Sequence, residues 1–310
     1  MSDIPQGALS PRLTSAESAK VAKAAGLRQM GVRPNLLHYI HLVWNRRSFI
    51  WNLSASKAYT KNQGSYLGQA WNILRPTLDA LVFIILFGFG FRAGRDGVAN
   101  IAAFIVIGTF TFSFMQGLIT SGVSSIRSNL SLVRSHQFPR AVVPLSVCMT
   151  DVVLFAQKLI AMLVIVFLCG FLPGMGHVPL TWTWLLTPVV AALSGIFAMG
   201  VGMFFARLGA RTPDLANIVP FFLNLLRFAS GVMFSISARI SPANHDTWWA
   251  RIIEYQPFAV YLNLMRACFG NDPNFQMSTL MWVLAVVYAV GFFVLGFIFF
   301  WGAEETYGRE

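Results

Sequence analysis

Six long runs of apolar residues constrain the fold of this chain more than any other feature of its sequence. A helix needs about 20 mainly apolar residues to cross a hydrocarbon core about 30 Å thick, because each residue rises about 1.5 Å. Of the 310 residues, 56% are hydrophobic and 11% are charged, whereas soluble domains carry about 25% charged residues. We therefore expect an all-α polytopic membrane protein with six transmembrane helices, over residues 76–93, 98–123, 142–171, 180–205, 215–236 and 278–301.

The basic residues between these runs predict which helix ends face the cytoplasm. The chain has 23 Lys and Arg residues and a formal net charge of +11. With a cytoplasmic amino terminus, sixteen of them lie on the cytoplasmic side and five on the other. Cytoplasmic loops carry the excess of Lys and Arg, so we expect both termini in the cytoplasm and the chain in the plasma (inner) membrane. Because these residues form no single stripe, nucleic acid is not an expected partner.

The amino-terminal quarter of the chain does not fit a membrane-spanning pattern. Residues 1–30 are expected to be a mobile cytoplasmic tail. In residues 31–75, Leu37, Ile40 and Trp44 alternate with polar side chains. This pattern is typical of an amphipathic helix that lies along the inner membrane surface with its aromatic rings at headgroup depth.

The six-span domain is expected over residues 76–303, followed by a short cytoplasmic tail at 304–310. Its longest outer connection contains NHDTWWARIIEY and PFAVYLNLMRACF, within residues 244–269. Each segment is too short to cross the membrane, so we expect two re-entrant helices that dip into the outer interface before the last span.

The motifs of common catalytic sites are missing from the sequence. There is no GxxxxGKS/T loop for a nucleotide phosphate, no HExxH, no GxSxG, and no acidic pair for a sugar nucleotide and its metal. Cys148, Cys169 and Cys268 lack metal-ligand or CxxC spacing, and His38 and His41 form only a lone pair. We expect neither an enzyme nor a metal site, and no catalytic residue is assigned.

Polar and aromatic residues share one face of the fifth apolar run and one face of the first. On the fifth run, the helical period aligns Asn217, Pro220, Asn224, Arg227, Gly231 and Ser235, with Phe221 and Phe228 beside them. On the first run it aligns Asp79, Phe83, Phe87, Gly90 and Gly94.

Arg227 is the most informative residue of these two faces. A charge in mid-membrane costs roughly 2.5 to 3.5 kcal/mol, so the Arg227 side chain should face protein or water. One interpretation is a cavity lining that meets an anionic or sugar group, with aromatic rings that stack on sugars. The alternative is a structural pair with Asp151 or Asp79, with phenylalanines that simply face lipid.

The connection between the second and third runs, SIRSNLSLVRSHQFPRAVVP at 125–144, holds a further signal. It carries three arginines and no acid, and it places Ile126, Leu130 and Val133 at helical spacing. A short amphipathic helix on the cytoplasmic side needs a partner surface for this apolar ridge. The alternative is an interfacial loop that merely follows the positive-inside bias.

Three segments of the sequence resemble one known family. YLGQAWNILRPTLDAL (66–81), IRSNLSLVRSHQFPRAVVPLS (126–146) and YQPFAVYLNLMRACFG (255–270) are similar in order and spacing to the Wzm/TagG-type permeases. These are the membrane subunits of ABC-2 polysaccharide exporters. The resemblance covers roughly residues 35–305, and Gln256 departs from it where Asn is expected.

The resemblance implies a homodimer of this subunit that works with two copies of a separate ABC ATPase. ATP and Mg would be bound by that ATPase, and no cofactor is expected in this chain. Residues 125–140 correspond to the coupling helix that docks on the ATPase. The residues that the resemblance assigns to this coupling are Ile126, Arg127, Leu130, Arg134, His136, Phe138, Pro139 and Arg140.

The resemblance also implies a polyprenyl-pyrophosphate glycan as substrate, with galactan as the cargo of the similar actinobacterial branch. The first and fifth spans of such permeases form a lateral gate. The implied substrate path comprises Asp79, Phe83, Phe87, Asn224, Arg227, Phe228 and Ser235. The cations available for the lipid head group are Arg46, Arg47, Lys57, Lys61 and Arg75.

Two other functions stay open from the sequence. An ABC-2 exporter of a drug or small lipid would show drug-stimulated ATP hydrolysis without dependence on a glycan. A multispan glycosyltransferase or lipid-modifying enzyme would be active without an ATPase partner, although the missing acidic pair argues against it.

Overall fold

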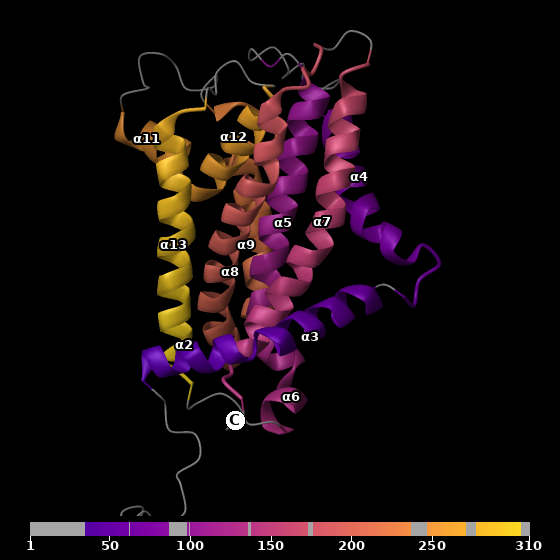
Figure 1. Ribbon diagram of the computed structural model, residues 1–310. Helices are drawn as coiled ribbons and strands as arrows, with labels where there is room; N and C mark the ends of the chain where they lie inside the picture. Colours follow the sequence, from indigo (N-terminus) through magenta and orange to yellow (C-terminus); the bar gives the residue numbers. More distant parts are fainter. Residues whose placement is uncertain are drawn as a thin grey trace, which may run out of the picture.

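The chain folds into a helical bundle with helices laid across both of its ends (Figure 1). The computed structural model describes residues 35–61, 63–86, 98, 100–135, 138–172, 176–236, 247–270 and 277–304. Within these ranges the regular structure is helical and contains no strand. The prediction of an all-α fold is confirmed.

Within the described residues, four helices are long and apolar enough to cross a membrane, and they run side by side along the bundle. α5 packs against both α7 and α8, and α13 packs mainly against α8. α5 is therefore the most enclosed of the four, whereas much of α13 faces outward. These helices are α5 (Ile101–Ser128), α7 (Val142–Cys169), α8 (Thr187–Arg211, preceded by the 3-10 turn η4 at Trp182–Leu186) and α13 (Thr279–Trp301).

Glycine pairs bring the long helices into backbone contact. A Cβ placed on Gly122 of α5 would lie 2.6 Å from the Cα of Gly202 on α8. A Cβ placed on Gly296 of α13 would lie 2.0 Å from the carbonyl oxygen of Gly200 on α8. Small residues allow this close approach, which is a common source of packing energy between helices in lipid.

The first and fifth predicted spans are shorter than expected in the described residues. α4 (Trp71–Phe83) has 13 residues and α9 (Leu215–Ala229) has 15, so they extend about 20 and 22 Å, against about 30 Å for the hydrocarbon core. α9 ends at Ala229 because Gly231 takes a positive φ of 73°. The prediction of a continuous fifth helix over 215–236 is therefore wrong, and residues 87–93 of the first predicted span lie outside the described ranges.

Two helices, α2 (Leu36–Asn45) and α3 (Arg47–Thr60), lie across one end of the bundle, followed by the short 3-10 turn η1 (Gly68–Ala70). The one-turn-and-a-half helix α6 (Leu130–Ser135) projects beyond them at the same end. We call this the α2 end. The segment 31–75, expected to hold one amphipathic helix, thus holds two that meet at Arg46.

The opposite end carries α11 (Trp248–Tyr255) and α12 (Pro257–Phe269), in the region where two short helices were predicted. α12 is buried over almost its whole length and contacts α5, α8 and α13. Arg266 of α12 is 1% exposed. Its guanidinium donates to the Val232 carbonyl at 2.9 Å and lies 3.4 Å from the centre of the Phe104 ring.

Candidate functional site

The polar faces of the first and fifth predicted spans meet in the structure. The Arg227 guanidinium of α9 lies 3.7 Å from an Asp79 carboxylate oxygen of α4 and donates to Gln116 Oε1 of α5 at 2.6 Å. The Gln116 amide in turn donates to Asn224 Oδ1 at 2.9 Å. We call these four residues the Arg227 cluster. It joins α4, α5 and α9 by charge and hydrogen bonding.

Aromatic rings surround the charged end of Arg227. Its guanidinium carbon lies 5.5 Å from the centre of the Phe112 ring and 6.0 Å from that of Phe83, distances at which a cation is attracted to the ring face. The Arg227 side chain is 12% exposed and that of Asp79 is 51% exposed. The cation is therefore largely enclosed, while its acidic partner remains open to the outside of the subunit.

The structure identifies the pairing that the sequence left open. Of the two candidate acids, Asp79 pairs with Arg227, while Asp151 pairs with Lys61. Gln116 was missed by sequence reasoning, although it is the only amide side chain within residues 101–123.

Three expected members of the polar faces do not join the cluster. Gly231 and Ser235 follow the end of α9, so the helical period that aligned them with Arg227 does not apply. Ser235 is buried, while Phe228 is half exposed on the outer side of α9. Phe87, Gly90 and Gly94 lie outside the described residues.

The predicted coupling segment is split between two helices. Ile126 and Arg127 belong to the last turns of α5, and the chain turns at Asn129 before α6 begins at Leu130. The expectation of one helix that includes Ile126 is therefore wrong. His136 and the side chain of Arg134 lie outside the described residues.

The apolar ridge of this segment is covered by the chain itself. Ile126 and Val133 are buried in a cluster with Tyr39, Met203 and Phe300. This contradicts the expectation that the whole ridge awaits a partner. The surface left open at this end comes from other residues of the segment, with Arg127 and Ser131 exposed and Leu130, Phe138, Pro139 and Arg140 partly exposed.

A partly buried carboxylate connects three parts of the α2 end. Glu304, just after α13, accepts a hydrogen bond from the Tyr39 hydroxyl at 2.6 Å and from the Arg140 backbone N–H at 2.9 Å. The Arg140 guanidinium donates to the Glu304 backbone carbonyl, and the Tyr39 oxygen accepts from the Ala141 N–H at 3.0 Å. Burial raises the pKa of Glu304, against the effect of these donors. We call Tyr39, Arg140 and Glu304 the Glu304 cluster.

The predicted head-group cations lie in different surroundings, in α3, in the residues that flank it and in α4. Lys61 pairs with Asp151 of α7 at 2.9 Å, and Lys57 donates to Asn129 Oδ1 at 2.6 Å. Partial burial lowers the pKa of Lys57. The guanidinium of Arg47 lies 5.6 Å from the Trp44 ring centre, and that of Arg75 lies 5.9 Å from that of Trp71.

The sequence also matches known proteins over most of this architecture. An O-antigen export system permease protein, RfbA, from Myxococcus xanthus is 27% identical over 202 residues, which cover 65% of this chain and 74% of that protein. RfbA from Klebsiella pneumoniae is 24% identical over 229 residues, or 74% of this chain and 83% of that protein. The polysialic acid transport protein KpsM from Escherichia coli is 22% identical over 171 residues, or 55% and 63%.

The family assignment rests on a match over residues 55–270, which include α4 to α12 and all four residues of the Arg227 cluster. It confirms the interpretation of the chain as a transport subunit and not an enzyme. The chain belongs to the ABC-2 type transporter family.

Proposed function

We propose that this chain is the membrane subunit of an ATP-driven exporter that moves a lipid-linked polysaccharide, a polyprenyl-pyrophosphate glycan such as a galactan, out of the cytoplasm. The names of its relatives, O-antigen and polysialic acid transport proteins, support a polysaccharide cargo. The lipid-linked form of the cargo and its sugar are the finer part of the proposal.

The Arg227 cluster is the observation that carries the proposed substrate path. In a homodimer of six-span subunits, α4 and α9 would line the path. The exposed Asp79 side chain would face the path, and the largely enclosed Arg227 side chain would lie next to it. α9 buries only Val219 and Leu223 within the subunit. Its outer face, with Phe221, Phe222 and Phe228 half exposed or more, is available to a second subunit or to sugar rings.

The α2 end would couple transport to ATP hydrolysis in a separate ATPase of two copies, which binds ATP and Mg. Closure of that ATPase would push on α6, and the push would reach α5 through Asn129 and reach α3 through the Lys57–Asn129 hydrogen bond. ATP can drive this change only if it favours one of two states of the assembly. Among the five predicted head-group cations, Lys57, Lys61 and Arg75 would receive the anionic head group of the cargo lipid.

Depletion of the chain in its native cells tests the cargo. We expect a polyprenyl-pyrophosphate glycan to accumulate on the cytoplasmic side, and an episomal wild-type copy to reverse this. If no glycan accumulates and the depleted cells become sensitive to drugs, the chain belongs to a drug or small-lipid exporter and the proposal is wrong. Glycosyl transfer by the purified chain without an ATPase would overturn it.

Two substitutions at the α2 end separate coupling from folding. Arg127→Glu changes an exposed residue beside α6, so we expect loss of transport and of transport-coupled ATP hydrolysis with normal insertion. Val133→Ser changes a buried residue of the same segment, so we expect a less stable subunit. Normal export by the Arg127→Glu variant would contradict the coupling role of this segment.

A further inference from the structure

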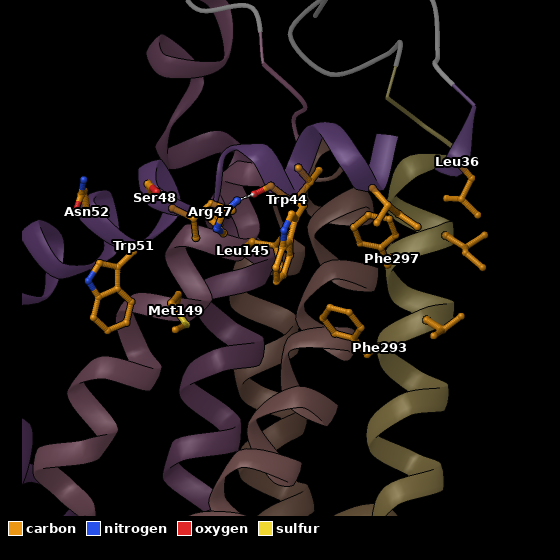
Figure 2. A pocket seen from close by; sticks show the side chains of 15 residues that line it. Leu36, Trp44, Arg47, Ser48, Trp51, Asn52, Leu145, Met149, Phe293 and Phe297 are labelled. Atoms are coloured by element: carbon orange, nitrogen blue, oxygen red, sulfur yellow. Dashed lines mark hydrogen bonds between the residues drawn. The ribbon is translucent and has the colours of Figure 1, made fainter. Parts of the chain in front are cut away.

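A groove of about 980 Å³ lies between the crossing helices α2 and α3 and the adjacent ends of α7 and α13 (Figure 2). Its volume is at the upper end of the range of about 300 to 1,000 Å³ that is usual for small-molecule sites. The groove lies on the α13 side of the bundle, whereas α4 of the Arg227 cluster lies on the opposite side (Figure 1). It is therefore separate from the proposed substrate path.

The two sides of the groove differ in chemistry. The bundle side is purely apolar and is built from Leu145 and Met149 of α7 with Phe293 and Phe297 of α13. Val294 of α13, also in the lining, is 45% exposed, so the groove opens on the face where the helix meets lipid. Hydrocarbon is the matching occupant for this side.

The polar groups of the groove gather on the α3 side. Arg47, Ser48 and Asn52 line it there, beside the rings of Trp44 and Trp51 (Figure 2). Tryptophan prefers the level of the lipid headgroups, where one edge of the ring is apolar and the other wet. Along the groove, apolar side chains are followed by the indole rings and then by the Arg47 guanidinium. This order matches a phospholipid, in which the acyl chains lead to the glycerol and then to the phosphate.

Arg47 lacks an acidic partner among the described residues. Its guanidinium makes one long hydrogen bond, 3.4 Å to the Trp44 carbonyl, and is exposed. Arg46 precedes it, and residues 36–60 contain no Asp or Glu. Guanidinium groups bind phosphate through paired N–H donors, so the charge at this rim favours a negatively charged head group.

We propose that the groove binds one anionic phospholipid of the cytoplasmic leaflet, with an acyl chain between α7 and α13 and its phosphate at Arg47. Such a lipid bridges the crossing helices and the bundle. It fixes the height of α2 and α3 against the ends of the long helices. The site is independent of the cargo that the exporter moves.

Native mass spectrometry of the full-length permease in detergent tests the site. The probes are phosphatidylglycerol, phosphatidylcholine with matched acyl chains, inorganic phosphate and decaprenyl phosphate. We expect phosphatidylglycerol to be retained at least about fivefold more strongly than phosphatidylcholine. Both lipids carry a phosphate, but only phosphatidylglycerol has a net negative charge, and each basic residue near the surface contributes about 1 kcal/mol toward an anionic lipid. Thermal unfolding should shift upward with phosphatidylglycerol alone.

Three variants connect this binding to the groove. Arg47→Gln should remove the preference for the anionic lipid, and Val294→Trp, which fills the groove, should reduce retention of both phospholipids. Arg211→Gln, at an exposed arginine of α8 outside the groove, is the matched control and should behave as wild type. Arg47 is exposed, so its variant is expected to fold.

Several outcomes would overturn the proposal. Equal retention of the two phospholipids by the wild type, or an unchanged preference in Arg47→Gln, would remove the phosphate site. If the permease binds inorganic phosphate but neither phospholipid, the apolar side of the groove does not bind an acyl chain and the proposal is wrong. Displacement of phosphatidylglycerol by decaprenyl phosphate at equal concentration would assign the groove to the tail of the substrate.

Discussion

At the scale of single residues, Arg227 has two polar partners in very different surroundings. Gln116 of α5 is partly buried and accepts a 2.6 Å hydrogen bond from Arg227, whereas Asp79 lies 3.7 Å away and is 51% exposed. Solvent screening reduces an exposed ion pair to about 0 to 1 kcal/mol. A hydrogen bond between membrane helices averages about 0.6 kcal/mol and reaches about 1.7 kcal/mol.

These magnitudes predict that Gln116, and not the acidic residue, is the stronger partner of Arg227. In double-mutant cycles of thermal unfolding in detergent, Arg227→Met with Gln116→Leu should give a coupling of about 1 to 1.7 kcal/mol. Arg227→Met with Asp79→Asn should give less than about 0.5 kcal/mol. The reverse order would mean that Asp79 is enclosed in the assembled protein, for example by a second subunit.

The Glu304 cluster gives a second prediction at this scale. Tyr39→Phe removes the 2.6 Å donor to a partly buried carboxylate, and we expect a loss of about 1 to 2 kcal/mol in the free energy of unfolding. Tyr59→Phe is the matched control, because Tyr59 is 74% exposed. Thermal unfolding of both variants under one condition measures the difference. Equal stability of the two would show that the hydroxyl of Tyr39 contributes nothing.

The sequence indicated that polar residues of the first and fifth runs would act together, yet it could not choose between Asp79 and Asp151 for Arg227. Spacing along one helix fixes which residues share a face. It carries no information on how that face is rotated toward its neighbours. The Glu304 cluster escaped prediction for a related reason, since Tyr39 and Glu304 are 265 residues apart in the chain.

At the scale of helices, hydropathy predicted the four longest spans. The errors in the predicted helix ends occur where packing or backbone conformation determines the end. α5 continues past the predicted end of its run to Ser128, because Ile126 packs against the rest of the chain. α9 stops early at a glycine with positive φ. Hydropathy reports the medium around a segment and is blind to both effects.

Contact between α8 and α13 depends on glycine at two facing positions. Gly296→Ala would place a methyl group 2.0 Å from the Gly200 carbonyl oxygen, so the helices must separate. We expect a loss of about 1 to 3 kcal/mol, the usual cost of overpacking. Gly291→Ala on the same helix meets nothing within 4 Å and is the control. Thermal unfolding in the same detergent compares them, and equal values would show that α13 shifts freely on α8.

At the scale of the whole molecule, everything proposed for α6 and for the groove requires the α2 end to face the cytoplasm. Arg46 and the cations of α3 lie at this end, together with Arg127, Arg140 and Arg207. The positive-inside rule then sets the orientation through the sum of these charges. No single contact within the described residues determines the orientation in the membrane, so the orientation needs a direct test.

Single cysteines at the two ends of the bundle test this orientation. The three native cysteines are buried, so an exposed engineered thiol gives the main signal. Ser131 lies on α6 at the α2 end. Thr181 is exposed just before η4 and hydrogen bonds to Thr183, whose hydroxyl donates to the Cys268 carbonyl of α12. A membrane-impermeant maleimide should label Thr181→Cys in intact cells and Ser131→Cys only in inside-out vesicles. The opposite pattern would put α6 where no ATPase could reach it and would contradict the coupling proposal, while the contacts of the Arg227 cluster would be unaffected.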